Sequence, residues 1–89
     1  QEKSTNEILM MAYSNKNSIE MTVKTKKAHF WSRSKKKLWL KGETSGNKLN
    51  ITNIYTDCDS DALIYEVELE GIGACHTGKK SCFYKKLEL

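Results

Sequence analysis

Residues 49–69 read LNITNIYTDCDSDALIYEVEL, and this stretch decides the fold. Apolar and polar side chains alternate through 49–56, in a run rich in β-branched residues, which predicts a β-strand. A second apolar, alternating run at 62–69 predicts another strand. Between them, DCDSD places three aspartates around a cysteine. Core packing does not require such a cluster, whereas metal chemistry does.

The rest of the chain adds short strands and one helix. Further strands are predicted at 8–13, 28–32, 38–41 and 81–84. A basic turn at 33–37 and a TSGN turn at 44–47 separate them. Asn15 or Asn17 can cap a helix that fades near Lys26, and Asn17 with Glu20 has capping-box spacing. We therefore expect a mainly β fold with one short helix, of α+β character.

The length and the cysteine count limit the classes of protein. A chain of 89 residues allows one domain, which we expect to span 1–89. Such a small domain is marginal alone and gains from a metal, disulfides or a partner subunit. No apolar run is long enough to cross a bilayer, and none resembles a signal peptide. Three cysteines are an odd number for a secreted disulfide framework, so we expect reduced thiols in the cytoplasm.

The chain carries a net charge of +4, with basic residues concentrated at 24–27 and 33–37. Such clusters favour anionic partners, which include nucleic acid, phosphorylated small molecules and acidic surfaces. For Lys35, Lys36 and Lys37 taken alone, we favour a solvated face that serves solubility.

Cys58, Cys75 and Cys82 are candidate zinc ligands, because thiolates favour zinc among the common metals. Three protein ligands leave a fourth position open, as catalytic zinc sites do. The alternative is that the cysteines are small buried apolar residues. Cys75 and Cys82 flank HTGKKS, a polar loop that fits this alternative poorly.

Asp57, Asp59 and Asp61 alternate along the chain, so an extended strand would place their carboxylates on one face and Cys58 on the other. Carboxylates this close require a cation such as magnesium or calcium. An EF-hand loop begins with the same spacing, but Ala62 stands where that loop needs glycine and the flanks read as strands. We therefore reject the EF-hand.

Five stretches, in order, are similar to one enzyme family. They are AYSN (12–15), AHFWSRS (28–34), LWLKGETSGN (38–47), DCDSDAL (57–63) and GACHTGKKSCFY (73–84). Together they resemble phosphoribosyl-AMP cyclohydrolase, which opens the adenine ring of phosphoribosyl-AMP in histidine biosynthesis. The resemblance implies an intertwined homodimer of small mixed sheets. It also implies a further N-terminal strand, of which only Gln1 remains, so we expect the visible chain to be truncated.

The resemblance also implies the metal sites. Zinc would be held at the positions of Cys58, Cys75 and Cys82, with the site completed across the subunit interface. Magnesium would be held at the positions of Asp57, Asp59 and Asp61. Ser14 in AYSN stands where many members have Met, a departure that we expect to be tolerated.

The implied substrate, 1-(5-phosphoribosyl)-AMP, has a ring carbon that water attacks before the adjacent C–N bond breaks. Zinc lowers the pKa of bound water, but three thiolates oppose that effect, so we expect a general base. His76 is our candidate for it, whereas we expect His29 to pack within a strand. Candidate substrate-binding residues are Arg33, Lys41, Ser32, Glu43, Ser45 and Trp31, with further donors from Ser34, Thr44 and the Gly46 amide.

Two other functions fit parts of the sequence. A small zinc-bearing nucleic-acid-binding module would use the basic turns and aromatic strands, and it would hold zinc with four ligands and need no aspartates. A metal-stapled structural subunit of a larger enzyme is the other, because the family is sometimes fused to a phosphoribosyl-ATP pyrophosphohydrolase domain. On the enzyme interpretation, the chain binds neither nucleic acid nor membrane.

Overall fold

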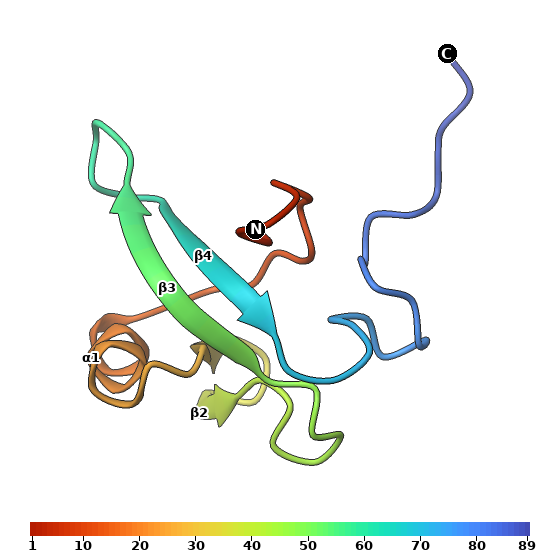
Figure 1. Ribbon diagram of the computed structural model, residues 1–89. Coiled ribbons are helices and arrows are strands. Elements are labelled where there is room, and N and C mark those ends of the chain that lie inside the picture. The colour runs from red at the N-terminus through yellow and green to blue at the C-terminus, as the bar shows by residue number, and fades with distance from the viewer.

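The computed structural model describes residues 1–89 and contains one helix and four strands (Figure 1). Helix α1 spans Lys16–Thr25. The strands are β1 (His29–Ser32), β2 (Lys37–Leu40), β3 (Leu49–Thr56) and β4 (Leu63–Leu69). β1 pairs with β2 and β3 pairs with β4, each antiparallel, in two two-stranded sheets. The expected mainly β fold with one short helix is confirmed. No helix is long and apolar enough to cross a membrane.

The first of the two candidate caps begins helix α1. The Asn15 side chain accepts from the Ser18 amide at 2.9 Å, and the Ser18 hydroxyl accepts from the Asn15 amide at 2.9 Å. The partner of the capping box is therefore Ser18, and the predicted pairing of Asn17 with Glu20 is wrong. Lys26 ends the helix in the left-handed conformation, close to where the pattern predicted its end.

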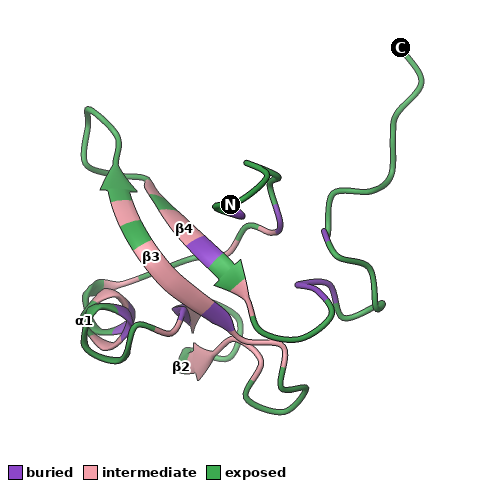
Figure 2. Cartoon of the chain, viewed as in Figure 1, coloured by how far each residue is buried: buried purple, intermediate pink, exposed green.

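The two sheets meet at the start of β3. The Ala28 amide donates to the Leu49 carbonyl at 3.0 Å, and the Ile51 amide donates to the Lys26 carbonyl at 2.8 Å. Phe30 packs against Trp39 and Tyr65, with ring centroids 5.1 and 5.8 Å apart. The buried apolar core forms around this junction (Figure 2) and consists of Leu9, Ala28, Phe30, Leu49, Val67 and Ala74.

Two predicted strands, 8–13 and 81–84, are not strands in the structure. They run beside each other with one backbone hydrogen bond between them, from the Cys82 amide to the Leu9 carbonyl at 2.7 Å. A single bond makes no ladder, although the fully buried Leu9 anchors the first segment in the core. The neighbour that pairs with the sheet is the chain start, where Glu2 forms a parallel bridge with Val67 on β4.

Candidate active site

The acidic loop, residues 57–61, joins β3 to β4 at the far end of the long hairpin (Figure 1). One ligand oxygen from each of Asp57, Asp59 and Asp61 lies within 4.8 Å of the others. The expected extended backbone is wrong, because the loop turns sharply and Ser60 adopts a left-handed φ of 58°. The turn still gathers the three carboxylates, and the strands on both sides exclude an EF-hand.

Local hydrogen bonds organise the acidic loop. The Asp57 carboxylate accepts from the amides of Asp61 and Ala62 at 3.1 and 3.2 Å. Partial desolvation raises the pKa of Asp57, but these amide bonds outweigh it and leave that pKa below its ordinary value. A cluster of exposed carboxylates provides the hard oxygen ligands that magnesium and calcium prefer.

The thiol loop, residues 73–82, is closed by two backbone hydrogen bonds. The Ala74 amide donates to the Lys80 carbonyl at 2.8 Å, and the Cys75 amide donates to the Lys79 carbonyl at 3.2 Å. At Gly73 a Cβ atom would lie 2.5 Å from the Lys80 Cα, so the loop closes tightly only around glycine. The predicted loop that turns between Cys75 and Cys82 is thus present.

The surroundings of the two thiols in this loop differ. Cys75 is buried, and its Sγ lies 3.0 Å from the Thr77 hydroxyl. Hydrogen bonds from Thr77 lower the pKa of Cys75, with a smaller contribution from the positive charge of Lys41. Cys82 is exposed as a residue, but partial desolvation of its thiol and the neighbouring Cys75 raise the pKa of Cys82. The two thiols therefore influence each other's pKa, and the positive charge of Lys41 acts to lower the pKa of both.

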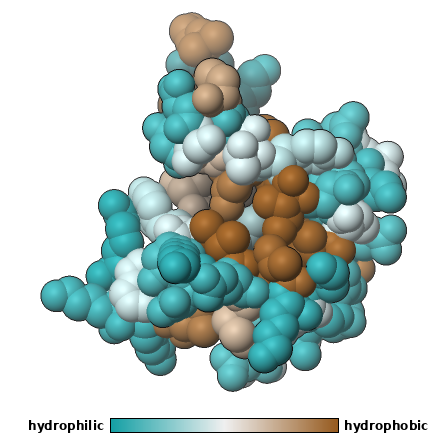
Figure 3. Space-filling view, turned by 90° about the vertical axis from the view of Figure 1, so that its left-hand side faces the viewer, coloured by the Kyte–Doolittle hydropathy of each residue, from teal (hydrophilic) through white to brown (hydrophobic).

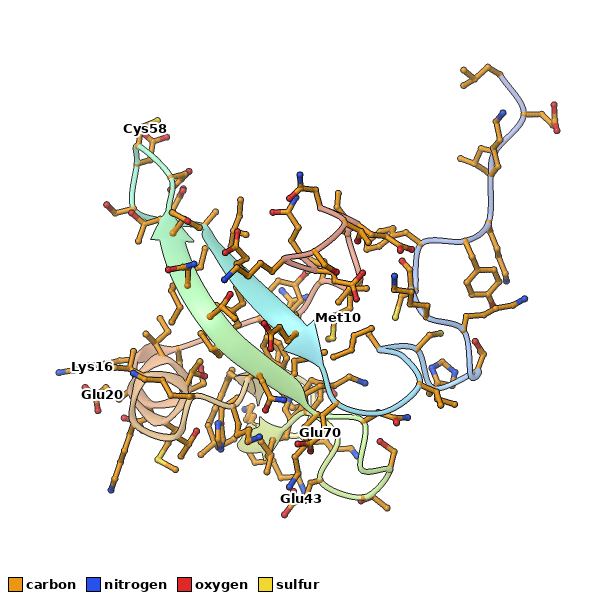
Figure 4. The ribbon with its side chains drawn as sticks, in the orientation of Figure 1. Met10, Lys16, Glu20, Glu43, Cys58 and Glu70 are labelled. Carbon is orange, nitrogen blue, oxygen red and sulfur yellow. The ribbon has the colours of Figure 1, made fainter.

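Cys58 lies apart from the other two cysteines. It is exposed at the tip of the β3–β4 hairpin, where its Sγ lies 3.9 Å from an Asp59 oxygen (Figure 4). The thiol loop lies beyond the opposite end of β4 (Figure 1). One chain therefore forms no cluster of three thiols, and the Asp57–Asp59–Asp61 group is its only candidate metal-ligand cluster.

The two histidines occupy different environments. His76 follows Cys75 directly in the thiol loop and is exposed, which leaves its ring accessible to a ligand. His29 is buried on β1, and its Nδ1 lies 2.8 Å from the Lys27 carbonyl oxygen. The expectation that His29 is a packed strand residue is confirmed.

The predicted substrate-binding residues line two adjoining open depressions. The first, of about 440 Å³, includes Ser32, Glu43 and Ser45. The second, of about 310 Å³, includes Trp31 and Arg33, and it shares Ser32 and Trp39 with the first. The antiparallel β1–β2 hairpin brings these residues together with the loop that follows β2. Figure 4 shows Glu43 on that loop, far from Cys58.

Several residues differ from their predicted surroundings. Arg33 lies over the Tyr13 ring, with its guanidinium carbon 3.6 Å from the centroid. Lys41 lies near the thiols and does not line either depression. The Gly46 amide, a predicted donor, is occupied by the Gly42 carbonyl at 2.8 Å.

The sequence interpretation missed Lys35 and Lys37 as lining residues of the first depression. The two strands predicted on either side of the turn at 33–37 could have indicated this placement of the lysines. If these strands pair as a hairpin, Lys37 lies opposite Ser32, as it does in the structure.

Comparison with known proteins gives a consistent result. The family model for phosphoribosyl-AMP cyclohydrolase matches residues 10–84. A protein of that name from Archaeoglobus fulgidus is 58% identical over 88 residues, covering 99% of this chain and 81% of the relative. Its counterpart from Prosthecochloris aestuarii is 55% identical over 86 residues, covering 97% of this chain and 62% of the relative.

A longer relative also matches throughout. The histidine biosynthesis bifunctional protein HisIE of Wolinella succinogenes is 49% identical over 89 residues, covering all of this chain and 38% of the relative. The chain thus spans less than two thirds of some curated relatives and most of another. On the family match and these identities, the chain belongs to the phosphoribosyl-AMP cyclohydrolase family.

Proposed function

We propose that this chain is the catalytic unit of a zinc-dependent hydrolase in cytoplasmic histidine biosynthesis. It opens the adenine ring of 1-(5-phosphoribosyl)-AMP to give the formimino-carboxamide ribotide. The main support is the thiol loop, which presents buried Cys75 beside Cys82, with exposed His76 next in the chain and Lys41 near both sulfurs. This arrangement joins metal ligands to a candidate base, within a family whose members carry the name of that activity.

The donor atoms fit the two metals. Cys75 and Cys82 supply two adjacent sulfurs for zinc, and the acidic loop supplies carboxylates for magnesium. Because Cys58 lies at the far hairpin tip, we assign the third sulfur to a second chain of a homodimer. An apolar patch on one face supports a partner chain (Figure 3), and exposed large apolar residues include Ile8, Met11 and Ile64.

The chain's own residues hold the substrate and move its protons. Zinc, when bound, would favour deprotonation of a water molecule, an effect that three thiolates oppose and that a base on the chain would assist. His76 would accept the proton of the water molecule that adds to the ring carbon bearing the amino group. His76 then returns the proton to the ring nitrogen as the C–N bond breaks. Arg33 and Lys41 bind phosphate, Trp31 contacts the base, and Ser32, Glu43 and Ser45 donate to or accept from the ribose and phosphate groups.

The Cys58→Ser variant tests the zinc assignment. Because Cys58 is exposed and contacts no distant segment, we expect its folded spectrum to match the wild type. Metal analysis should show loss of zinc, and absorbance at the purine band should show loss of ring opening. Thr56→Ser, at the end of β3, is the control and should retain both. Normal zinc content and turnover in Cys58→Ser would contradict the assignment.

Mixing subunits tests whether the site is shared between chains. Cys58→Ser and Cys75→Ser proteins are each expected to be inactive. When equal amounts of the two variants are unfolded and refolded together, half of the dimers contain one chain of each variant. In such a mixed dimer, one of the two zinc sites regains all three thiols. Activity should then recover to about a quarter of the wild-type value. If all three ligands came from one chain, mixing would restore no activity.

A further inference from the structure

The first depression contains positive charge that the proposed function has not yet used. Besides Ser32, Glu43 and Ser45, it is lined by Lys35, Lys37 and Thr44. We refer to it below as the lysine depression. Its volume of about 440 Å³ lies within the roughly 300–1,000 Å³ typical of small-molecule sites.

The β1–β2 hairpin places both lysines on this depression. Lys37 is the register partner of Ser32, and the Lys35 amide donates to the Ser32 hydroxyl at 3.2 Å. Lys36 stands between them in the left-handed conformation, with φ of 51°, and does not line the depression. The turn thus places Lys35 and Lys37 on the depression and Lys36 outside it, although the three are consecutive in the sequence.

The lysine depression has little negative charge to neutralise these ammonium groups. Ion pairs in the structure join Lys16, Lys27 and Lys80 to carboxylates, and none involves Lys35 or Lys37. Glu43 is the one acidic residue in the lining. The charge on the two lysines is therefore available to an anion.

The loop after β2 adds uncharged donors. The amides of Thr44 and Ser45 donate to no backbone carbonyl, because the loop is closed one residue later, from the Gly46 amide to Gly42. At Gly42, φ is +82° and a Cβ would lie 2.4 Å from the Asn47 backbone, so only glycine permits this tight closure. The Ser45 Oγ accepts from the Asn47 amide at 3.1 Å, which leaves its own proton to donate.

We propose that the lysine depression binds the phosphate of one ribose 5-phosphate arm of the substrate, a role that rests on the proposed function. Lys35 and Lys37 neutralise the phosphate dianion, and the Thr44 and Ser45 amides donate hydrogen bonds to its oxygens. Glu43 accepts from a ribose hydroxyl.

The test uses ribose 5-phosphate as the probe and the full chain, without requiring turnover. In a two-dimensional amide NMR titration, the resonances of Thr44 and Ser45 should shift with a single binding constant. Ribose without phosphate should produce no such shifts. In K35Q/K37Q the dissociation constant should rise about tenfold or more, because two charged hydrogen-bond donors are lost.

K36N is the matched control, since it removes one positive charge from the same turn and asparagine tolerates the left-handed backbone. Its dissociation constant should stay within about twofold of the wild type, because Lys36 makes no hydrogen bond to the bound phosphate. Equal binding by K35Q/K37Q and the wild type would overturn the proposal. The proposal would also be overturned if K36N weakened ribose 5-phosphate binding as much as the double variant does. That result would indicate general electrostatic attraction by the basic turn and not a specific site.

Kinetics separates this inference from the proposed function. In an active enzyme, K35Q/K37Q should raise KM for phosphoribosyl-AMP about tenfold while kcat remains nearly unchanged. If the chain binds ribose 5-phosphate as described but opens no purine ring, phosphate binding at the lysine depression is supported and the proposed hydrolase function is wrong. If the chain turns over the substrate and KM is unchanged in K35Q/K37Q, the hydrolase function is supported and phosphate binding at the lysine depression is wrong.

Discussion

The acidic loop and the thiol loop both carry candidate metal ligands, but different contacts hold them in place. The acidic loop is closed by its own residues: Asp57 accepts from the amides of Asp61 and Ala62, four and five positions later. The thiol loop is attached to the opposite end of the chain. The Cys82 amide bonds to Leu9, the Ser81 hydroxyl donates to the Ile8 carbonyl at 2.6 Å, and the Lys80 ammonium pairs with Glu2 at 2.6 Å.

This difference separates two ways of building a metal site. The acidic loop depends on local backbone geometry, so it should persist when distant packing is disturbed. The thiol loop depends on residues more than 70 positions away in sequence, so its geometry should follow the stability of the core. Each variant below is chosen to disturb one loop while the other serves as an internal reference.

The largest effect is expected from removing the candidate base. His76→Asn should reduce kcat by about 10²- to 10⁴-fold, because no other histidine is exposed beside the thiols. The acid limb of the pH–rate profile should disappear, which a purely structural role would not cause. Lys79→Gln, an exposed neighbour in the same loop, is the control. An unchanged rate and acid limb in His76→Asn would refute the assignment.

Truncating the anchor of the thiol loop should have the next largest effect. Leu9 is fully buried, so Leu9→Ala should lower the free energy of unfolding by about 2–5 kcal/mol in urea denaturation. Hydrogen exchange should accelerate at the Cys82 amide more than at the Asp61 and Ala62 amides. Ile8→Ala is the control, because that side chain is 61% exposed. Equal acceleration in both loops would remove the distinction between them.

Acidification should loosen the thiol loop through Glu2. The hydrogen bond from Lys80, with a second from Thr5, holds the pKa of Glu2 below its ordinary value of 4.5. The contribution to stability is therefore fully present above pH 4.5 and is lost as the pH falls through the lowered pKa. Exchange at the Cys82 amide should rise over that range in the wild type and much less in Glu2→Gln. An identical pH dependence in both proteins would contradict this attachment.

The smallest structural effect is expected in the acidic loop. Asp59→Asn removes one charge but none of the amide bonds to Asp57, so the amide NMR spectrum outside residues 57–61 should remain unchanged. Magnesium affinity, measured by calorimetry, should fall. Glu68→Gln, exposed on β4, is the control for charge alone. If Asp59→Asn bound magnesium with unchanged affinity, the assignment of magnesium to the acidic loop would be wrong.

Sequence patterns predicted the elements whose causes are local. The alternation in 49–56 and 62–69 predicted β3 and β4, and Asn15 was one of two candidate caps for α1. The segments 8–13 and 81–84 have the same apolar character but form no ladder. Composition shows that a segment can be extended, whereas a strand also needs a neighbour that supplies successive hydrogen bonds. The structure provides only isolated bonds, from the Cys82 amide to the Leu9 carbonyl and from the Trp31 amide to the Tyr13 carbonyl.

The sequence by itself determined the helix and the closeness of the three aspartates, because each depends on neighbours a few residues apart. It also predicted the four strands that pair as hairpins, together with two at 8–13 and 81–84 that find no partner strand. It also contained the motifs of the family. Only the tertiary structure decided that Cys75 and Cys82 lie on the N-terminal segment while Cys58 lies at the far hairpin tip. It also separated Lys35 and Lys37 from Lys36. These positions depend on which distant segments pack together, and local patterns carry no information about that packing.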